Sequence, residues 1–116
     1  MEEREDTVHD LHLFEKMDQA IRKDQLFTQH GMGREHLCRL LGVNRNRFAE
    51  IMRKYSGERN VCAYLNRMRM EYAVSMMREH PNWSLAAIIE SCGMSLTPFK
   101  KCFKETYGMP PSAPRI

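Results

Sequence analysis

The sequence predicts an all-α fold of about six or seven helices, in which a long central helix joins two smaller helical subdomains. Three observations support this prediction. Apolar residues recur at the three- and four-residue spacing of helices. No stretch of four or more residues shows the clean polar and apolar alternation of a half-buried strand. One stretch of the chain also recurs later at a fixed offset of 51 residues.

The first three predicted helices precede residue 59. The first begins after Thr7 and extends toward Gly31, which interrupts it. A short second helix ends at Gly42. The third begins at Asn44, a good N-cap residue, and ends before Gly57. The apolar residues that define these helices are Leu13, Met17, Ala20, Ile21, Leu37, Leu40, Leu41, Phe48, Ile51, Met52 and Tyr55.

The remaining three predicted helices follow in the second half of the chain. The fourth runs from about Asn60 to His80 and is stopped by a proline. Apolar residues nearly encircle this helix, as expected of a helix that packs on two sides. Ser84 can cap the fifth helix, Ser95 can cap the sixth, and Gly108 ends the sixth.

Charge separates the chain into an acidic and a basic part. Residues 1–30 carry 8 acidic and 4 basic side chains, whereas residues 31–116 carry 7 acidic and 14 basic ones. A contiguous basic part favours a polyanionic partner, although a mildly basic solvated surface is the commoner cause of a modest excess. The predicted organisation is an acidic segment 1–12, a first subdomain 13–58, a linker helix 59–80 and a second subdomain 81–116.

Several classes of protein are excluded by what the sequence lacks. It has neither a membrane-spanning apolar run nor a basic secretory signal, so we expect a cytoplasmic chain without membrane contact. The four cysteines lack metal-binding spacing and fall in helical apolar patterns, which predicts buried reduced thiols, no metal site and no cofactor. Motifs of phosphate-binding loops, hydrolases and zinc proteases are missing, so no enzyme is expected.

The internal repeat defines a structural unit. Gly42 matches Gly93 and Phe48 matches Phe99 at the offset of 51 residues. Each copy predicts a short helix, a glycine turn, an N-cap residue and a longer helix with one apolar and one basic face. A helix-turn-helix requires this pattern, because glycine permits a positive φ and one helix face stays available for a DNA groove. The fourth helix would be roughly 30 Å long, close to the roughly 34 Å between successive major-groove faces of DNA.

The second copy carries the most specific motif. It comprises SLAAIIESCGMS at residues 84–95, FKKCFKETYGMPPS at residues 99–112, and Arg115. From about Leu13 to Arg115, the chain resembles the C-terminal DNA-binding domain of AraC/XylS-type bacterial transcription regulators. The resemblance implies a homeodomain-like pair of helix-turn-helix units that binds promoter or operator DNA, with RNA polymerase as a partner. Residues 1–12 would then tether an upstream sensor or dimerisation module, although shorter members without that module exist.

Three features depart from the family pattern. Five residues separate Gly93 from the aromatic Phe99, where six are usual, so base contacts carried over from relatives can be displaced by one position. Met94 stands in place of the usual phenylalanine after the glycine. Pro114 stands in place of the usual aromatic residue before the final arginine.

The outward face of the third helix supplies the first set of candidate DNA contacts. Arginine matches the hydrogen-bonding pattern of guanine, asparagine that of adenine, and a carboxylate can accept from cytosine N4. The candidate base contacts are Arg45, Asn46, Ala49 and Glu50, and the candidate phosphate contacts are Arg47 and Arg53. An ordinary solvated helix face is the alternative, and Glu50 could equally repel DNA or pair with Arg47.

The second set of candidates lies on the fifth and sixth helices. The candidate base contacts are Leu96, Thr97, Lys100 and Lys101, and the candidate phosphate contacts are Ser84 and Lys104. Lysines suit phosphates better than base edges, so the second unit is expected to hold the duplex more than it reads it. A plain capping role explains Ser84 equally well. Arg67 and Arg69 on the fourth helix either reach the DNA backbone or pair with Glu71 or Glu90.

The predicted function is sequence-specific binding of double-stranded DNA for transcription regulation, with two recognition helices in successive major grooves. The alternative is a helical interaction module that binds an acidic protein partner without DNA specificity.

Overall fold

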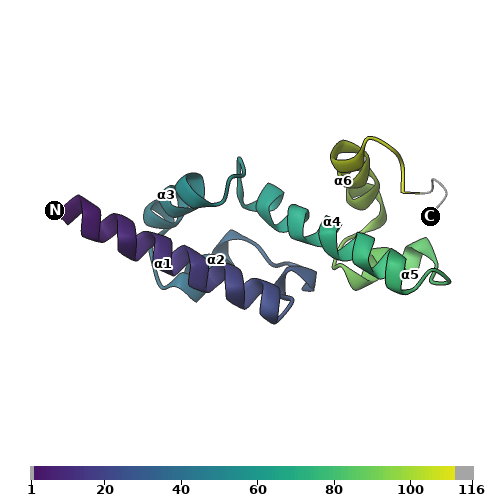
Figure 1. Cartoon of the computed structure of the whole chain (residues 1–116), viewed down its shortest axis with the longest axis horizontal. Coiled ribbons are helices and arrows are strands. Elements are labelled where there is room, and N and C mark those ends of the chain that lie inside the picture. Colours follow the sequence, from purple (N-terminus) through teal and green to yellow (C-terminus); the bar gives the residue numbers. More distant parts are fainter. Residues whose placement is uncertain (1, 112–116) are drawn as a thin grey trace. The chain divides into compact units, whose positions relative to one another are not determined.

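A computed structural model describes residues 2–111, and the side chains of residues 8–111. The elements are α1 (Glu2–Lys23), the 3-10 helix η1 (Leu26–Thr28), α2 (Arg34–Leu41), α3 (Arg45–Tyr55), α4 (Val61–Glu79), α5 (Leu85–Ser91) and α6 (Leu96–Tyr107) (Figure 1). The predicted all-α fold is confirmed, because the described residues form helices and connecting turns only. None of the described helices is long and apolar enough to cross a membrane. Ser112, Pro114 and Arg115 of the C-terminal motif lie outside the described residues.

The chain divides into two compact units. The first contains the residues up to Leu26 together with Gly31–Leu65, and therefore holds α1, α2, α3 and the first turn of α4. The second contains Phe27–His30 together with the residues from Asn66 onward, and holds the rest of α4 with α5 and α6. The segment that follows α1 thus belongs to the second unit rather than to the helix that precedes it in sequence.

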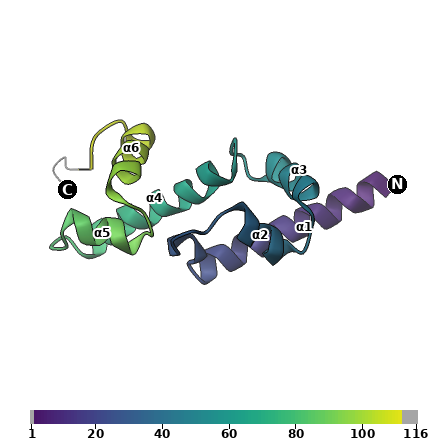
Figure 2. The ribbon, with the colours of Figure 1, turned by 180° about the vertical axis from the view of Figure 1, so that it is seen from behind.

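In the first unit, α1 packs against α2 and α3 (Figure 2). Its core contains fully buried apolar side chains from these three helices, Ile21, Leu37, Phe48 and Ile51. The Tyr64 hydroxyl at the start of α4 donates to Asp18 Oδ1 of α1 at 2.5 Å. Both burial and this hydrogen bond raise the pKa of Tyr64, so the phenol stays protonated as a donor. The first turn of α4 is thereby fixed to α1.

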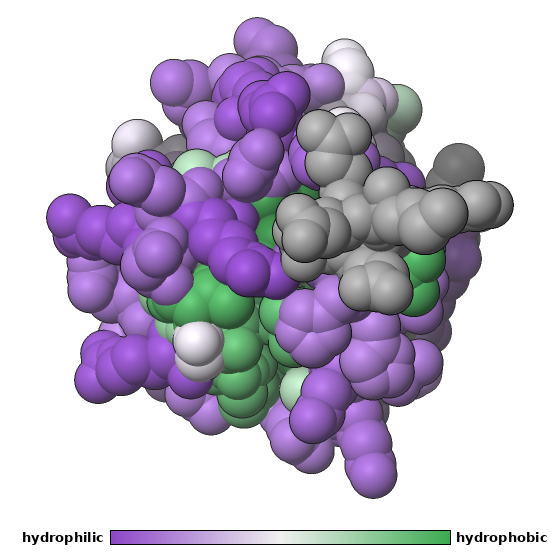
Figure 3. All heavy atoms as spheres, turned by 90° about the vertical axis from the view of Figure 1, so that its left-hand side faces the viewer, coloured by the Kyte–Doolittle hydropathy of each residue, from purple (hydrophilic) through white to green (hydrophobic). Residues whose placement is uncertain are grey.

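The face of the first unit at the α1 and α3 end is mainly hydrophilic (Figure 3). Figure 3 shows charged and polar side chains around a smaller apolar patch on the face at the α1 and α3 end. Val8 and Leu11 of α1 are exposed apolar residues in this unit, at 65% and 39%. Leu40 of α2 is likewise exposed, at 48%. Because apolar atoms contribute much of any folded surface, such scattered residues alone do not indicate a binding site.

The predicted limits of the first helix are wrong at both ends. α1 begins at Glu2 rather than after Thr7. α1 ends at Lys23, well before Gly31, because Gln25 adopts a φ of 52° in the left-handed region and η1 follows.

The core of the second unit joins α4, α5 and α6. It consists of the buried residues Met70, Ala73, Ile88, Ile89, Cys92, Met94, Phe99 and Phe103. Phe27 adds to it, since its ring lies 5.5 Å from that of Tyr72 of α4. Arg69 of α4 donates from Nε to the carbonyl oxygen of Phe27 at 2.7 Å. The buried Arg69 therefore fixes the segment after α1 to the second unit and does not pair with Glu71 or Glu90 through this donor.

The cysteines differ in exposure. Cys38 and Cys92 are buried as predicted, and burial raises the pKa of the Cys92 thiol to about 11. The prediction is wrong for Cys62, which is exposed on α4, and Cys102 of α6 is half-buried. Cys62 lies in the first turn of α4.

Candidate nucleic-acid interface

The turn between α2 and α3 forms as the sequence predicts. Gly42 adopts a φ of 71°, and its N–H donates to the carbonyl oxygens of Cys38 at 2.9 Å and Arg39 at 3.2 Å. Asn44 is the N-cap of α3, because its Oδ1 accepts from the backbone N–H of Arg47 at 2.8 Å. A left-handed glycine followed by a capped helix is the turn that a helix-turn-helix needs.

Helix α3 has a buried face and an exposed face. Phe48 and Ile51 are fully buried, and Met52 is 4% exposed. The opposite side carries the predicted residues Arg45, Asn46, Ala49, Glu50 and Arg53, all of them exposed. These residues share one face because side chains three or four positions apart in an α-helix lie on the same side. The structure therefore brings the first set of candidates, apart from Arg47, onto one surface.

Arg47 is placed differently from the other candidates. Its guanidinium donates from Nε at 3.1 Å and from Nη2 at 2.7 Å to Oδ1 of Asp10 in α1. The side chain of Asp10 is only 11% exposed. This bond connects α3 to α1, and Asp10 rather than Glu50, one of the alternatives that the sequence left open, is the acid that pairs with Arg47. Asp10 was missed because it lies in the acidic segment, yet its spacing from Leu13 and Met17 places it on the buried face of α1.

Replacing Asp10 with asparagine is expected to destabilise the first unit. Arg47 would keep a half-buried guanidinium without a charged partner, so the free energy of unfolding should fall by about 1–3 kcal/mol. Glu71→Gln is the control. In the Arg67–Glu71 pair the Nε and Oε1 atoms are 3.6 Å apart and both side chains are exposed, so this pair should contribute less than about 1 kcal/mol to the free energy of unfolding. Urea unfolding followed by circular dichroism measures both, and equal losses would contradict the role assigned to Asp10.

Arg45, the first residue of α3, forms an ion pair with Glu35 in the first turn of α2. The bond joins Arg45 Nη2 to Glu35 Oε1, and both side chains are exposed, at 71% and 63%. The hydrogen bond from Arg45, followed by its charge, lowers the pKa of Glu35 below the ordinary value. Sequence reasoning missed Glu35, because the exposed acid carries no periodic signal.

The second helix-turn-helix follows the same design with two differences. The Ser84 hydroxyl caps α5 by accepting from the N–H of Ala87 at 3.1 Å, and Gly93 turns the chain with a φ of 78°. Gly93 is buried, whereas Gly42 is exposed. Ser95 occupies the N-cap position of α6 with extended backbone, but its side chain makes no capping hydrogen bond, contrary to its predicted role.

Helix α6 presents the second set of candidates. Phe99 and Phe103 face the core at 0% and 8% exposure, and the opposite side carries Leu96, Thr97, Lys100, Lys101 and Lys104, all exposed. Leu96 is 52% exposed at the first position of the helix. Ser84 is also exposed at the start of α5. The exposed face of α6 thus presents three lysines and no arginine.

Comparison with known proteins gives one match. A family model described as a helix-turn-helix domain matches residues 37–115, which is more than half of the chain and includes both glycine turns. The chain belongs to the AraC/XylS-type helix-turn-helix family. No curated protein and no solved structure shows significant similarity to it. As an AraC-type domain with a homeodomain-like fold, it is a DNA-binding domain of transcription regulation.

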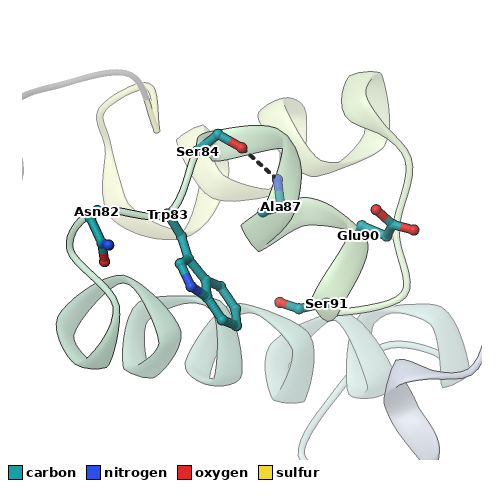
Figure 4. A pocket seen from close by; sticks show the side chains of 6 residues that line it. All are labelled: Asn82, Trp83, Ser84, Ala87, Glu90 and Ser91. Atoms are coloured by element: carbon teal, nitrogen blue, oxygen red, sulfur yellow. Dashed lines mark hydrogen bonds between the residues drawn. The ribbon is translucent and has the colours of Figure 1, made fainter.

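A pocket lies beside α5 of this AraC-type domain. It is lined by Asn82, Trp83, Ser84, Ala87, Glu90 and Ser91 (Figure 4). Trp83 points toward α4, and its indole stacks on the ring of His80, the residue after α4, with ring centroids 3.9 Å apart. Glu90 points away from the indole. The hydroxyls of Ser84 and Ser91 are engaged with the backbone of α5. Its polar groups therefore do not converge on one ligand.

The candidate residues of the AraC-type domain contain no metal-binding arrangement. Among the side chains that the structure describes, no three histidine, cysteine, aspartate or glutamate residues lie close enough to hold an ion. Arg67 forms an exposed pair with Glu71, one of the two alternatives that the sequence left open for it. The candidate residues on the exposed helix faces present hydrogen-bonding groups, charges and methyl groups.

Proposed function

We propose that the chain binds double-stranded DNA sequence-specifically to regulate transcription, with α3 and α6 in successive major grooves. The observation that supports this is the exposed polar face of α3, which follows a left-handed glycine turn and lies opposite a buried apolar face. The same arrangement recurs in α6. A helix of 19 residues connects the two units in sequence, and a single chain can therefore supply both recognition helices.

The exposed residues have distinct proposed roles. Arg45 reads guanine, Asn46 reads adenine, and Glu50 accepts from cytosine. Ala49, Leu96 and Thr97 offer methyl groups to thymine, and Lys100 and Lys101 lie where base edges or nearby phosphates can be reached. Arg53, Ser84 and Lys104 bind phosphates. Arg47 has the weakest support as a phosphate contact, because two of its donors bind Asp10.

RNA polymerase is the proposed protein partner, as the family resemblance implies. The proposed place of action is the bacterial cytoplasm, where the DNA lies. An upstream sensor or dimerisation module in a longer protein is a further proposed partner of residues 1–12. These three proposals rest on the family and not on any contact in the structure.

A footprint on a site selected from a random duplex library tests the two-groove proposal. The chain is expected to protect about two turns of DNA as a monomer, because each unit covers one major-groove face. Binding should weaken steeply as salt increases, since phosphate contacts release counterions. Protection of a single half-site would contradict the two-groove proposal. The interaction-module alternative predicts two other results. The chain would bind a poly-acidic peptide more tightly than duplex DNA, and its affinity for DNA would fall only slightly as salt increases.

A further inference from the structure

We propose that Glu35 is a specificity-determining residue that positions Arg45 for guanine recognition. This inference rests on the proposed function, because it requires Arg45 to read a base. It concerns a residue of α2 that does not itself lie on the recognition helix. Glu35 also precedes the matched residues 37–115, so the family match does not explain it.

The geometry of the ion pair fits a positioning role. Glu35 lies in the first turn of α2 and Arg45 is the first residue of α3, so the pair joins the starts of the two helices of the motif. Glu35 Oε1 binds one donor, Nη2, of a guanidinium that has five N–H donors in a fixed planar fork. The remaining donors include enough for the two acceptors of guanine, O6 and N7.

An arginine without such a partner carries a large entropic cost of binding. Arg45 is 71% exposed, and a long exposed side chain samples many rotamers that DNA binding must restrict. A carboxylate that already holds the guanidinium reduces this cost before the DNA arrives. The hydrogen bond from Arg45 lowers the pKa of Glu35, so the acid is charged near neutral pH, as the pair requires.

The internal repeat supplies an independent observation. At the offset of 51 residues, Arg45 corresponds to Leu96, and Glu35 corresponds to Ala86. The second unit thus lacks both members of the pair, and the acid occurs only in the copy that contains the arginine. An acid at a DNA-binding surface repels phosphates, so its position beside Arg45 indicates a gain that offsets the repulsion.

A positioning role and a merely structural role predict different results. An exposed ion pair contributes little to stability, so removing Glu35 should leave the melting temperature nearly unchanged. Loss of its negative charge should strengthen binding to random duplex by about twofold or more. Loss of its hold on Arg45 should at the same time weaken the discrimination for guanine. Only a positioning residue moves affinity and specificity in opposite directions.

The experiment uses the full chain and a duplex site selected from a random library. Each guanine in the half-site under α3 is replaced in turn by 7-deazaguanine, which removes the N7 acceptor and keeps base pairing. For the wild type, one replacement should weaken binding at least about fivefold, and Arg45→Ala should abolish that penalty. Glu35→Ala should reduce the penalty by half or more, and Glu35→Gln, which keeps an acceptor, should give an intermediate value. Glu79→Gln, which removes the same charge from the end of α4, should match the wild type.

The outcomes separate this inference from the proposed function. A penalty that disappears in Arg45→Ala but stays complete in Glu35→Ala would overturn the role of Glu35 alone. If Glu35→Ala folds poorly, a complete penalty in Glu35→Gln would overturn that role in the same way. A wild type that shows no penalty at any guanine would overturn base reading by Arg45, and with it the role of Glu35.

Discussion

Replacing Gly93 with alanine is expected to unfold the second unit or to lower its free energy of unfolding by roughly 3 kcal/mol or more. Gly93 has a φ of 78°, which strains any residue with a Cβ. That Cβ would also lie 2.0 Å from the carbonyl oxygen and 2.5 Å from the carbonyl carbon of Thr28. These are backbone atoms of a segment that Arg69 and Tyr72 hold in place, so they cannot rotate away as a side chain could.

Gly42→Ala is the matched control for Gly93→Ala. Gly42 occupies the corresponding turn with a φ of 71°, but a Cβ there meets no atom of the described part of the chain within 4 Å. Only backbone strain remains, which costs about 1–2 kcal/mol. Urea unfolding followed by circular dichroism measures both variants, and the fluorescence of the single tryptophan, Trp83, adds a probe of the second unit, where Gly93 lies. A loss of similar size at the two glycines would show that the close approach of Thr28 contributes nothing.

The sequence predicts the two turns as equivalent, and the structure shows why they are not. The repeat correctly predicts both left-handed glycines, because that backbone conformation is a local property of the turn. The close approach of Thr28 to Gly93 is not local, since it depends on how the segment after α1 packs on the second unit. Among the described residues, no counterpart of this segment packs on Gly42. A periodic pattern does not encode such a contact between residues far apart in sequence.

The same distinction applies to the candidate interface. Helical periodicity correctly places Asn46, Ala49 and Lys104 on exposed faces, because burial of Phe48 and Phe99 fixes the rotation of each helix. The ion partners of Arg45 and Arg47 were not predicted, because they come from other helices. Spacing along one helix shows which side chains share a face, and it does not show which charges meet across a helix packing interface.

The two half-sites of the bound DNA are expected to contribute unequally to specificity. Arg45→Ala or Asn46→Ala should relax sequence preference and cost about 1–3 kcal/mol at the base pairs that these residues read. Lys100→Ala or Lys104→Ala should weaken binding to all duplexes similarly and reduce the salt slope by about 0.9 for each phosphate that the variant no longer neutralises. If the lysine variants changed preference and the Arg45 variant did not, the roles assigned to the two units would be reversed.

Single base-pair substitutions across both half-sites measure this asymmetry directly. The entry of α6, where base edges are approached, carries Leu96 and Thr97 in place of Arg45 and Asn46, and the turn before it is one residue shorter than the family pattern. Leu96 donates no hydrogen bond and can recognise only apolar groups, of which the thymine methyl is the one in the major groove. Most substitution penalties should therefore fall under α3. Replacing thymine with uracil under α6 removes that methyl alone, so any penalty that Leu96 causes there should become smaller in Leu96→Ala. Equal penalties across the two half-sites would contradict the predicted asymmetry.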